Sequence, residues 1–447
     1  EELMVDVHPF RALHFDPKIV GDLTRVTSQP YDKIDDALQK VYYDRHPNHI
    51  VRVIRGRDES TDTKASNKYT RARGFVEGWL KKAVLVRDEK PSLYSYRQVY
   101  ATGGTTRTRQ GLTAMVRLEE PGRGNILPHE QTHIGPKVDR FKLLNACMTH
   151  FGHIFLLYSD PERKINSILA KASQGAPPLA SKDDLGEMHE AWPVTEAASI
   201  QAIQAVLKGK TAIIADGHHR YETAYKFMLD LSKAGAKAEG TETHLNVLAT
   251  LVNMDDEGLT LFGTHRLVDS CEDFEGFRRR LTELFAVRAM PPDAAALDKA
   301  VRESRNPAFG IIEQRSSEFF LATLRDPATA VAKVGGSQSR EWKLLDVNIL
   351  HGLILHPLLG VTPDDLAHER RIGYRRHAQE VVEAVRVKKR FQVGLLVRPC
   401  TVQQIQAITK MGERFPQKTT DFYPKLLSGF IMCRLNVDRT GLEKLKG

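Results

Sequence analysis

One segment constrains the fold more than any other: a short apolar run that ends at Asp216-Gly217 and continues into residues with helical periodicity. The run, residues 211–215, has the length and the β-branched content of a buried strand. The apolar positions after it recur at helical spacing, at Tyr221, Ala224, Met228 and Leu231. A buried strand that leads directly into an amphipathic helix indicates a sheet covered by helices, so the segment predicts a mixed fold, α+β or α/β.

Similar signals recur along the chain and extend this prediction. Helices are expected at residues 69–83, 274–284, 344–355 and 402–411, and a helix is expected to end at 203–207. Single strands are expected at residues 49–54, 154–158, 393–397 and 429–435. Hairpins are expected between 93–100 and 105–115, between 245–252 and 259–262, and between 309–312 and 319–324.

The composition permits a large core. The 447 residues are 41% hydrophobic, and at roughly 150 residues per domain this length predicts about three domains. No run approaches the length of a membrane helix, and the opening Glu1-Glu2 does not resemble a signal peptide. The four cysteines lie far apart without a CxxC pair, which excludes a disulfide scaffold and fits a reducing compartment. We therefore expect a cytoplasmic protein without a membrane partner.

The charge balance favours anionic ligands. The 65 basic residues outnumber the 56 acidic ones, which gives a net charge of +9 and does not choose among phosphates, nucleotides and nucleic acid. The basic clusters lie in helical patterns with few interleaved aromatic residues, which favours solvated helix faces over a nucleic-acid surface. These clusters are Arg278–Arg280, Arg370-Arg371, Arg375-Arg376 and Lys388–Arg390.

The turn after the 211–215 run carries residues suited to phosphate. Free backbone N–H groups and the positive end of the following helix converge there, and Gly217 allows a ligand to approach the backbone closely. Arg220 is expected to clamp phosphate oxygens in a bidentate fork, with His218 or His219 as further donors. Asp216 is expected to cap the helix, hold a histidine or bind Mg²⁺. The alternative is a helix cap beside polar surface histidines.

A second motif, Pro128 to His133, matches the H-E-x-x-H pattern of zinc proteases. In that interpretation His129 and His133 bind zinc and Glu130 activates water. The pattern requires a continuous helix, whereas Pro128 precedes it and Gly135-Pro136 follows closely. We therefore favour Glu130 as a general base in a turn, and keep a zinc hydrolase as an alternative.

A third segment, Lys418-Thr419-Thr420, lies in a loop that follows Pro416. A lysine with paired hydroxyls can hold a carboxylate or a phosphate. By itself this signal is weak, and a polar surface loop is the default interpretation.

Taken in chain order, Pro128-His129-Glu130, the Asp216 to Arg220 segment and Lys418-Thr419-Thr420 resemble the three landmarks of archaeal free L-serine kinases. Those enzymes phosphorylate free serine to O-phosphoserine, and their core is similar to ParB and sulfiredoxin. The wider chain also resembles a bacterial family of uncharacterised proteins of this length.

The resemblance implies an α+β fold with a ParB/sulfiredoxin-like catalytic core. The implied division is an N-terminal α+β segment (1–125), the catalytic core (126–270) and a C-terminal α+β domain (271–447) that contributes the Lys-Thr-Thr loop. Free L-serine is the implied acceptor and Mg²⁺ the implied cofactor. The implied donor is ATP or ADP, with pyrophosphate as a further candidate, because no P-loop sequence is present to define the donor.

The resemblance also implies a role for each matching residue. Glu130 is the implied general base on the serine hydroxyl. The implied catalytic and phosphate-binding residues are Asp216 (also the metal ligand), Gly217, His218, His219 and Arg220. The implied substrate-binding residues are His129, Lys418, Thr419 and Thr420.

This chain departs from the archaeal pattern after Thr420. Asp421 stands where those kinases have an arginine, so another cation must meet the serine carboxylate or Asp421 must face the serine ammonium. Lys418 and Lys425 are the nearest cations in sequence. Two alternatives stay open: a ParB-like, nucleotide-dependent regulator that binds nucleic acid, and the zinc hydrolase.

Overall fold

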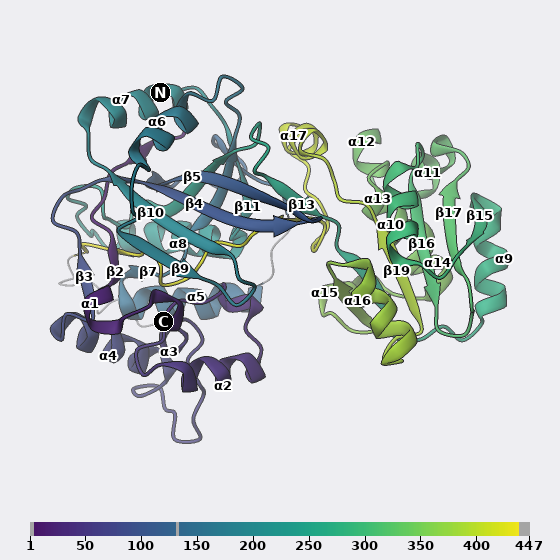
Figure 1. Ribbon diagram of the computed structural model, residues 1–447, viewed down its shortest axis with the longest axis horizontal. Coiled ribbons are helices and arrows are strands. Elements are labelled where there is room, and N and C mark those ends of the chain that lie inside the picture. The colour runs from purple at the N-terminus through teal and green to yellow at the C-terminus, as the bar shows by residue number, and fades with distance from the viewer. Residues whose placement is uncertain (1–3, 131–133, 438–447) are drawn as a thin grey trace. The chain divides into compact units, whose positions relative to one another are not determined.

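The computed structural model describes residues 4–130 and 134–437, which divide into two compact units (Figure 1). Unit 1 contains most of the chain up to residue 260 and resumes at Pro424. Unit 2 contains residues 261–423 together with His129 and Glu130. The chain therefore leaves unit 1 and returns to it near its C-terminal end.

The sheet of unit 1 is large and mixed, and it contains strands from both sides of position 125. In spatial order its strands are β6 (Ile126–Pro128), β11 (Ala212–Asp216), β8 (Ile154–Tyr158), β12 (Asn246–Asn253), β5 (Thr105–Arg117), β4 (Leu93–Thr102), β10 (Met188–Val194) and β9 (Leu179–Lys182), with β1 (Val7–His8) beside β5. β12 runs parallel to β8 and antiparallel to β5. The division into segments 1–125, 126–270 and 271–447 stays a prediction.

The two faces of this sheet have different coverings. Helices α6 (Lys164–Ala172) and α7 (Ala197–Leu207) pack on one face, in a core that includes Leu156 (Figure 1). Residues 424–435 follow the other face, where the backbone N–H of Leu427 donates to the hydroxyl of Tyr96. The C-terminal segment therefore takes the place of a helix layer on that face.

Further short elements complete unit 1. Its other helices are α1 (Pro17–Val20), α2 (Asp36–Arg45), α3 (Val51–Ile54), α4 (Lys68–Lys81), α5 (Ile134–Cys147) and α8 (His218–Lys233). Two small sheets pair β2 (Leu13–Phe15) with β3 (Leu85–Arg87) and β7 (Thr149–His150) with β21 (Cys433–Arg434).

Unit 2 is a six-stranded antiparallel sheet with helices on both faces (Figure 1). Its strand order is β15 (Phe285–Met290), β17 (Phe319–Leu324), β16 (Ala308–Glu313), β19 (Val393–Val397), β14 (His265–Val268) and β18 (Ile372–Arg375). One face packs against α9 (Phe274–Leu284), α11 (Pro327–Lys333), the π-helical turn Leu350–Leu355 and α14 (His356–Leu359). The other packs against α10 (Ala294–Glu303), α16 (Ala378–Val382) and the π-helical turn Glu383–Val387. The remaining helices are α12 (Arg340–Lys343), α13 (Asp346–Ile349), α15 (Pro363–Ala367) and α17 (Val402–Lys410).

Aspartates start three helices of unit 2. The side chains of Asp273, Asp293 and Asp326 accept hydrogen bonds from backbone N–H groups in the first turns of α9, α10 and α11. Such caps satisfy N–H groups that have no partner inside the helix, and each stabilises its helix by about 1 kcal/mol. The local sequence thus fixes where these helices begin.

Most predicted elements are confirmed, but residues 49–54 do not form a strand. Val51–Ile54 forms the short helix α3, and the backbone N–H of Val51 donates to Nδ1 of His49 at 3.1 Å. Four apolar residues here are buried: Ile50, Val51, Val53 and Ile54. Because they are buried together, tertiary packing outweighs the strand propensity of valine and isoleucine.

The predicted hairpin between residues 245–252 and 259–262 is also wrong. β12 lies between β5 and β8, so both of its edges are taken, and all its residues are buried. β13 (Thr260–Phe262) pairs instead with β20 (Asp421–Tyr423). Long-range pairing therefore replaces the local pairing that the turn residues indicated.

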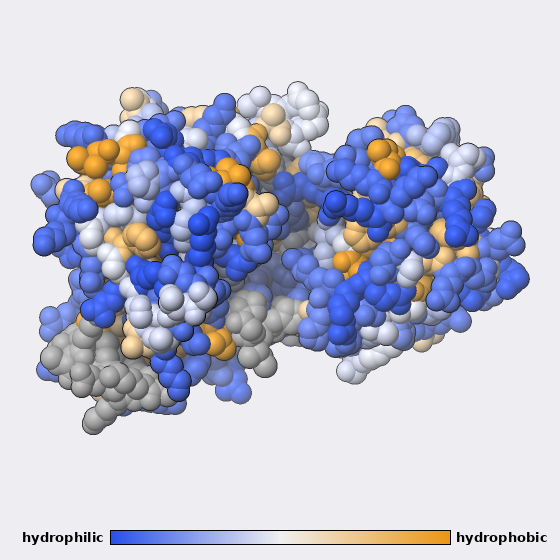
Figure 2. All heavy atoms as spheres, turned by 90° about the horizontal axis from the view of Figure 1, so that it is seen from below, coloured by the Kyte–Doolittle hydropathy of each residue, from blue (hydrophilic) through white to orange (hydrophobic). Residues whose placement is uncertain are grey.

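The mixed α+β class is confirmed, while the ParB/sulfiredoxin-like character of the core stays a prediction. Within residues 4–130 and 134–437, no helix has both the length and the hydropathy to span a membrane. On the faces that Figure 2 shows, hydrophilic residues predominate and hydrophobic ones lie in small separate groups.

Candidate functional site

Asp216 ends β11, and a β-bulge decides which way its side chain points. Ala212 to Ile214 pair with β8 in regular register, and the register then shifts so that Asp216 pairs with Phe155. Ala212 and Ile214 belong to the core on the helix-covered face. If side chains simply alternated along the strand, Asp216 would point to the same helix-covered face as Ala212 and Ile214. The extra residue of the bulge turns its side chain to the opposite face of the sheet. Asp216 therefore faces the side that residues 424–435 cover.

Two cations meet at the carboxylate of Asp216. Arg220 Nη2 donates to Oδ2 at 2.7 Å, and Lys425 Nζ donates to Oδ1 at 3.0 Å. The three side chains are only 14–23% exposed. Burial alone raises the pKa of Asp216, but the charges of Lys425 and Arg220 outweigh it and hold the pKa well below its ordinary value. The carboxylate is therefore ionised and fixes both cations in place.

Helix α8 begins directly after this carboxylate. Gly217 is its N-cap with φ of +92°, a conformation that other residues rarely adopt, as the sequence predicted for the sharp turn. Gly217 has no side chain to cap the helix, and both carboxylate oxygens of Asp216 are bonded elsewhere, so the expectation that Asp216 caps the helix is wrong. Its side chain bonds Arg220 and Lys425 instead. His218 is buried and His219 is half-buried in the first turn.

A cavity of about 60 Å³ lies beside Arg220 in unit 1. Its lining includes Arg140, Tyr31, Thr149, Thr223 and Ser428, so with Arg220 two guanidinium groups and four hydroxyls border it. Its volume admits a few water molecules, which suits a small anionic group rather than a whole nucleotide. Arg220 therefore borders both the Asp216 ion pair and a small cavity in which a few polar groups lie among mostly apolar side chains.

Glu130 and His129 belong to unit 2, where they meet the Lys-Thr-Thr loop. Glu130 forms a parallel β-bridge with Phe415, and the N–H of Phe415 donates to the carbonyl of His129 at 2.7 Å. The fully buried His129 places Nε2 2.7 Å from the hydroxyl of Thr420. Two segments about 290 residues apart in sequence are thus brought together, while their shared role in substrate binding stays a prediction.

The Lys-Thr-Thr loop is held by its own contacts. Thr419 is buried and donates its hydroxyl hydrogen to the carbonyl of Pro416. Lys418 has φ of +57° and lies 3.2 Å from a carboxylate oxygen of Glu369. Because Lys418 and Glu369 are largely exposed, this ion pair contributes little to stability.

Asp421, which stands where the archaeal kinases have an arginine, pairs with Arg376. Arg376 Nε donates to Asp421 Oδ2 at 2.7 Å, and the guanidinium of Arg376 lies 4.4 Å from the ring centre of Tyr423. Asp421 is therefore neutralised within unit 2. This contact argues against the expectation that Asp421 faces the ammonium of a substrate.

Glu130 lies within electrostatic reach of a buried arginine. Burial lowers the pKa of Arg266, and the negative charge of Glu130 is among the groups that oppose this shift. Burial also raises the pKa of Tyr374, and the negative charge of Glu130 raises it further. Sequence reasoning quoted Arg266 only as part of a family resemblance, because nothing local to residues 264–266 indicates such a neighbour.

The zinc-protease interpretation lacks its helix at Glu130. The residue lies in a β-bridge, and helix α5 is described from Ile134 to Cys147. His133 lies outside the described residues. Contrary to expectation, Gly135-Pro136 does not break the helix but lies in its first turn, where proline's missing N–H costs nothing.

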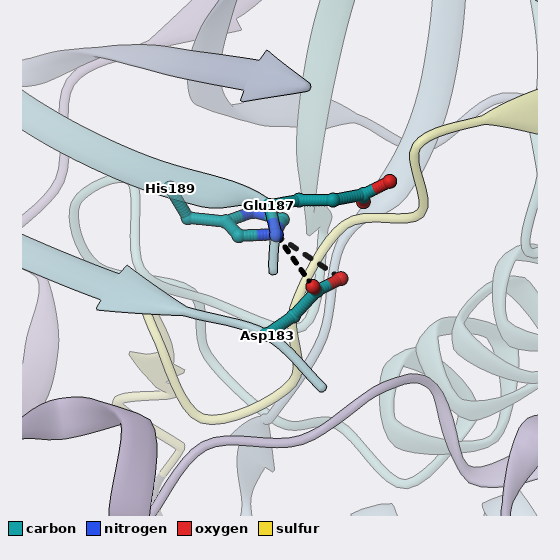
Figure 3. Close-up of side chains that lie close together, drawn as sticks. All are labelled: Asp183, Glu187 and His189. Atoms are coloured by element: carbon teal, nitrogen blue, oxygen red, sulfur yellow. Dashed lines mark hydrogen bonds and ion pairs between the residues drawn. The ribbon is translucent and has the colours of Figure 1, made fainter. Parts of the chain in front are cut away.

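Sequence reasoning missed a cluster of metal-ligand types at the turn between β9 and β10 (Figure 3). Atoms of Asp183, Glu187 and His189 lie within 4.8 Å of one another. Gln98 turns its carbonyl to Arg109 and its NH₂ to Nδ1 of His189 at 3.3 Å. Nδ1 is then an acceptor, so Nε2 carries the hydrogen and points at Asp183, 3.7 Å away. A protonated nitrogen cannot bind a metal, so the cluster is better explained as a group of polar side chains in which the ring of His189 faces Asp183.

The fit of Mg²⁺ at Asp216 is poor. Both carboxylate oxygens are bonded to cations, and an ion there would displace Arg220 or Lys425. Mg²⁺ needs near-octahedral oxygen ligation, commonly from carboxylates and substrate phosphates. The residues around Asp216 suit an anion better, and Mg²⁺ as cofactor stays a prediction.

Comparisons with known proteins give a family and distant structural likenesses. The family model described as "Protein of unknown function (DUF1015)" matches residues 7–348. No curated protein matches the chain. Similar solved structures include a conserved hypothetical protein from Pyrococcus furiosus (15% identity, TM-score 0.31, covering 68% of this chain and 90% of that chain). A free serine kinase in complex with AMP has 14% identity and a TM-score of 0.33, covering 72% of this chain and 90% of that chain. SbnI with C-terminal truncation from Staphylococcus aureus has 10% identity and a TM-score of 0.34, covering 71% of this chain and 85% of that chain. At TM-scores of 0.31–0.34 these structures assign no role to any residue of this chain.

Proposed function

We propose that this chain, which belongs to the DUF1015 family of proteins of unknown function, is a phosphotransferase. It transfers a phosphoryl group from a nucleotide, ATP or ADP, to the hydroxyl of a small acceptor, which we take to be free L-serine. The observation that carries the proposal is the meeting of Arg220 and Lys425 at Asp216.

The Asp216 cluster supports the donor half of the reaction. One carboxylate against two cations leaves a net positive charge at the start of helix α8, whose N-terminal end also attracts anions. Arg220 borders a small cavity, and its bonds to Asp216 and to the carbonyl of His153 hold its guanidinium in place before any ligand arrives. Fixed cations of this kind stabilise the charge that develops on a transferring phosphoryl group. Arg220 and Lys425 are accordingly assigned to the donor phosphates.

Glu130 supports the acceptor half. A serine hydroxyl is a weak nucleophile, and a positioned carboxylate accelerates its attack by removing the proton. The backbone of Glu130 is fixed by its bridge to Phe415, and its neighbour His129 contacts Thr420 of the Lys-Thr-Thr loop. Glu130 is therefore assigned as the base.

The proposed step balances as a simple displacement. The acceptor oxygen forms a bond to the terminal phosphorus of the nucleotide while its proton passes to Glu130. The bond from that phosphorus to the bridging oxygen breaks, and the leaving nucleotide keeps the electron pair. With ATP the products are ADP and O-phosphoserine, and with ADP they are AMP and O-phosphoserine.

The direct test is a product assay. Purified protein is incubated with Mg²⁺, L-serine and one donor at a time, namely ATP, ADP or pyrophosphate, and products are followed by phosphorus NMR. A phosphoserine resonance that depends on both protein and nucleotide is expected. Nucleotide hydrolysis alone, or phosphorylation of a sugar in preference to serine, contradicts the proposed acceptor.

Replacing Arg220 is expected to weaken donor binding selectively. Arg220→Ala should raise the KM for the nucleotide by about 10–100-fold, the range of a lost charge-assisted hydrogen bond, with a smaller effect on the KM for serine. Arg220→Lys should not restore the wild-type KM for the nucleotide, because an ammonium cannot reproduce the two parallel donors of a guanidinium. Lys226→Ala, on the exposed side of α8, is the matched control. Wild-type kinetics in Arg220→Lys would exclude bidentate contact.

A further inference from the structure

Arg266 is a buried arginine whose guanidinium is only partly satisfied. The residue lies on β14 and is 1% exposed. Its Nη1 donates to the carbonyl of Thr264, and its guanidinium lies 5.3 Å from the ring centre of Tyr374. Nε and Nη2 have no hydrogen-bond partner among the residues that the structure describes. Two donors on one edge of the guanidinium are thus left unused.

A partly buried arginine in unit 2, Arg398, shows the contact that Arg266 lacks. Arg398 donates from both Nε and Nη2 to the carboxylate oxygens of Asp346. The same two donors of Arg266 meet no carboxylate within the described part of the chain. An uncompensated buried charge costs several kcal/mol, so a buried guanidinium with this edge free favours an anionic partner from outside the chain.

The surroundings of Arg266 narrow the kind of anion. His351 has a buried Nε2 that also lacks a partner among the described residues. Burial and the charge of Arg266 lower the pKa of His351 to about 3, so its ring is neutral near pH 7 and adds no charge. The single positive charge of Arg266 therefore matches a singly charged anion with two oxygens, which is a carboxylate.

We propose that Arg266 binds the carboxylate of the acceptor through its Nε and Nη2 donors. This inference rests on the proposed function, and it replaces the expectation that Lys418 or Lys425 meets that group. Lys425 is paired with Asp216, and Lys418 lies beside Glu369 on an exposed surface. Arg266 lies instead within electrostatic reach of Glu130, the proposed base. The acceptor class is therefore a hydroxylated carboxylic acid, of which L-serine is one member.

The wild-type protein tests the inference without any substitution. L-Serinamide and ethanolamine keep the hydroxyl and the amine of serine but lack its carboxylate. Both are expected to be phosphorylated with kcat/KM at least about 30-fold below that of L-serine, the loss that follows when one partner of a buried charge pair is removed. Equal use of serinamide and serine would overturn the inference while leaving the phosphotransferase assignment intact.

Arg266→Gln supplies the second arm. It should raise the KM for L-serine by at least about 30-fold, leave the KM for the nucleotide unchanged and remove the preference for serine over serinamide. Arg325→Gln, at an exposed position of unit 2, is the control, and thermal unfolding of each variant shows whether it folds. An unchanged KM for serine in a folded Arg266→Gln protein would overturn the inference.

A binding experiment separates the two proposals. Calorimetric titration of L-serine and of serinamide into the wild-type protein and Arg266→Gln needs no turnover. Serine binding that is lost in Arg266→Gln supports the carboxylate site even where no phosphoryl transfer is detected. Serine binding that is equal in both proteins contradicts the site, whatever the product assay shows.

Discussion

Glu130→Gln is expected to lower the rate of phosphoryl transfer by about 10²–10⁴-fold, the usual contribution of a general base. The substitution keeps the size of the side chain and removes its capacity to accept a proton. The backbone bridge between Glu130 and Phe415 does not involve the side chain, so folding should be retained. The measurement is kcat with saturating serine and nucleotide.

Glu120→Gln is the matched control, since Glu120 is an exposed glutamate of unit 1 that should not alter turnover. Serine binding by Glu130→Gln should stay close to wild type, because the proposed carboxylate site at Arg266 is untouched. Turnover within a factor of about three of wild type would remove Glu130 from the mechanism and leave the phosphate-binding cluster without an identified base.

Asp216→Asn is expected to destabilise the protein by about 1–3 kcal/mol, between the costs of breaking an exposed and a fully buried ion pair, because the three side chains are 14–23% exposed. The change leaves Arg220 and Lys425 without their shared counter-charge. Urea unfolding followed by circular dichroism measures the effect. Asp230→Asn is the control, because Asp230 pairs with the exposed Lys226 on the same helix and its loss should cost less than about 1 kcal/mol. Equal stability losses in the two variants would contradict the buried-pair description.

The ion pair of Asp216 with Lys425 and Arg220 predicts how stability depends on pH. The pKa of Asp216 is depressed in the folded protein relative to the unfolded chain, where an aspartate titrates near about 3.9. Its stabilisation is therefore fully present above that pH and is lost as the pH falls towards the folded-state pKa. The stability difference between wild type and Asp216→Asn should shrink in acid, and a difference that grows below pH 4 would contradict the assignment.

Local sequence predicted the parts of the donor cluster that depend on neighbouring residues. The apolar run before Asp216 identified β11, and Gly217 identified the turn into α8. The bulge that turns Asp216 to the other face depends on pairing with β8, and Lys425 comes from a segment 209 residues away. Neither leaves a signal within the strand itself, so the orientation and the second cation could not be predicted.

For the residues assigned to the acceptor, local sequence predicted less than it did for the donor cluster. His129 and Thr420 were both assigned to substrate binding from a family resemblance, and the contact between them was not predicted from either segment. Arg266 could not be singled out, because an unsatisfied guanidinium is defined by burial and by missing partners, which are properties of the folded chain. For the same reason residues 49–54 were predicted as a strand: the apolar pattern was visible, and the packing that makes it a helical turn was not.

The return of the chain to unit 1 at Pro424 sets an order of events during synthesis. At about 5–20 residues per second, the ribosome needs about 10–30 s for the roughly 160 residues of unit 2 that intervene. During that interval Tyr96 lacks Phe430, against which its ring packs, and Asp216 lacks Lys425. A nascent chain at this stage carries an uncovered sheet face, the kind of surface that chaperones bind. Ribosomes stalled before residue 424 should therefore hold a protease-sensitive unit 1, and release of the finished chain should make it resistant.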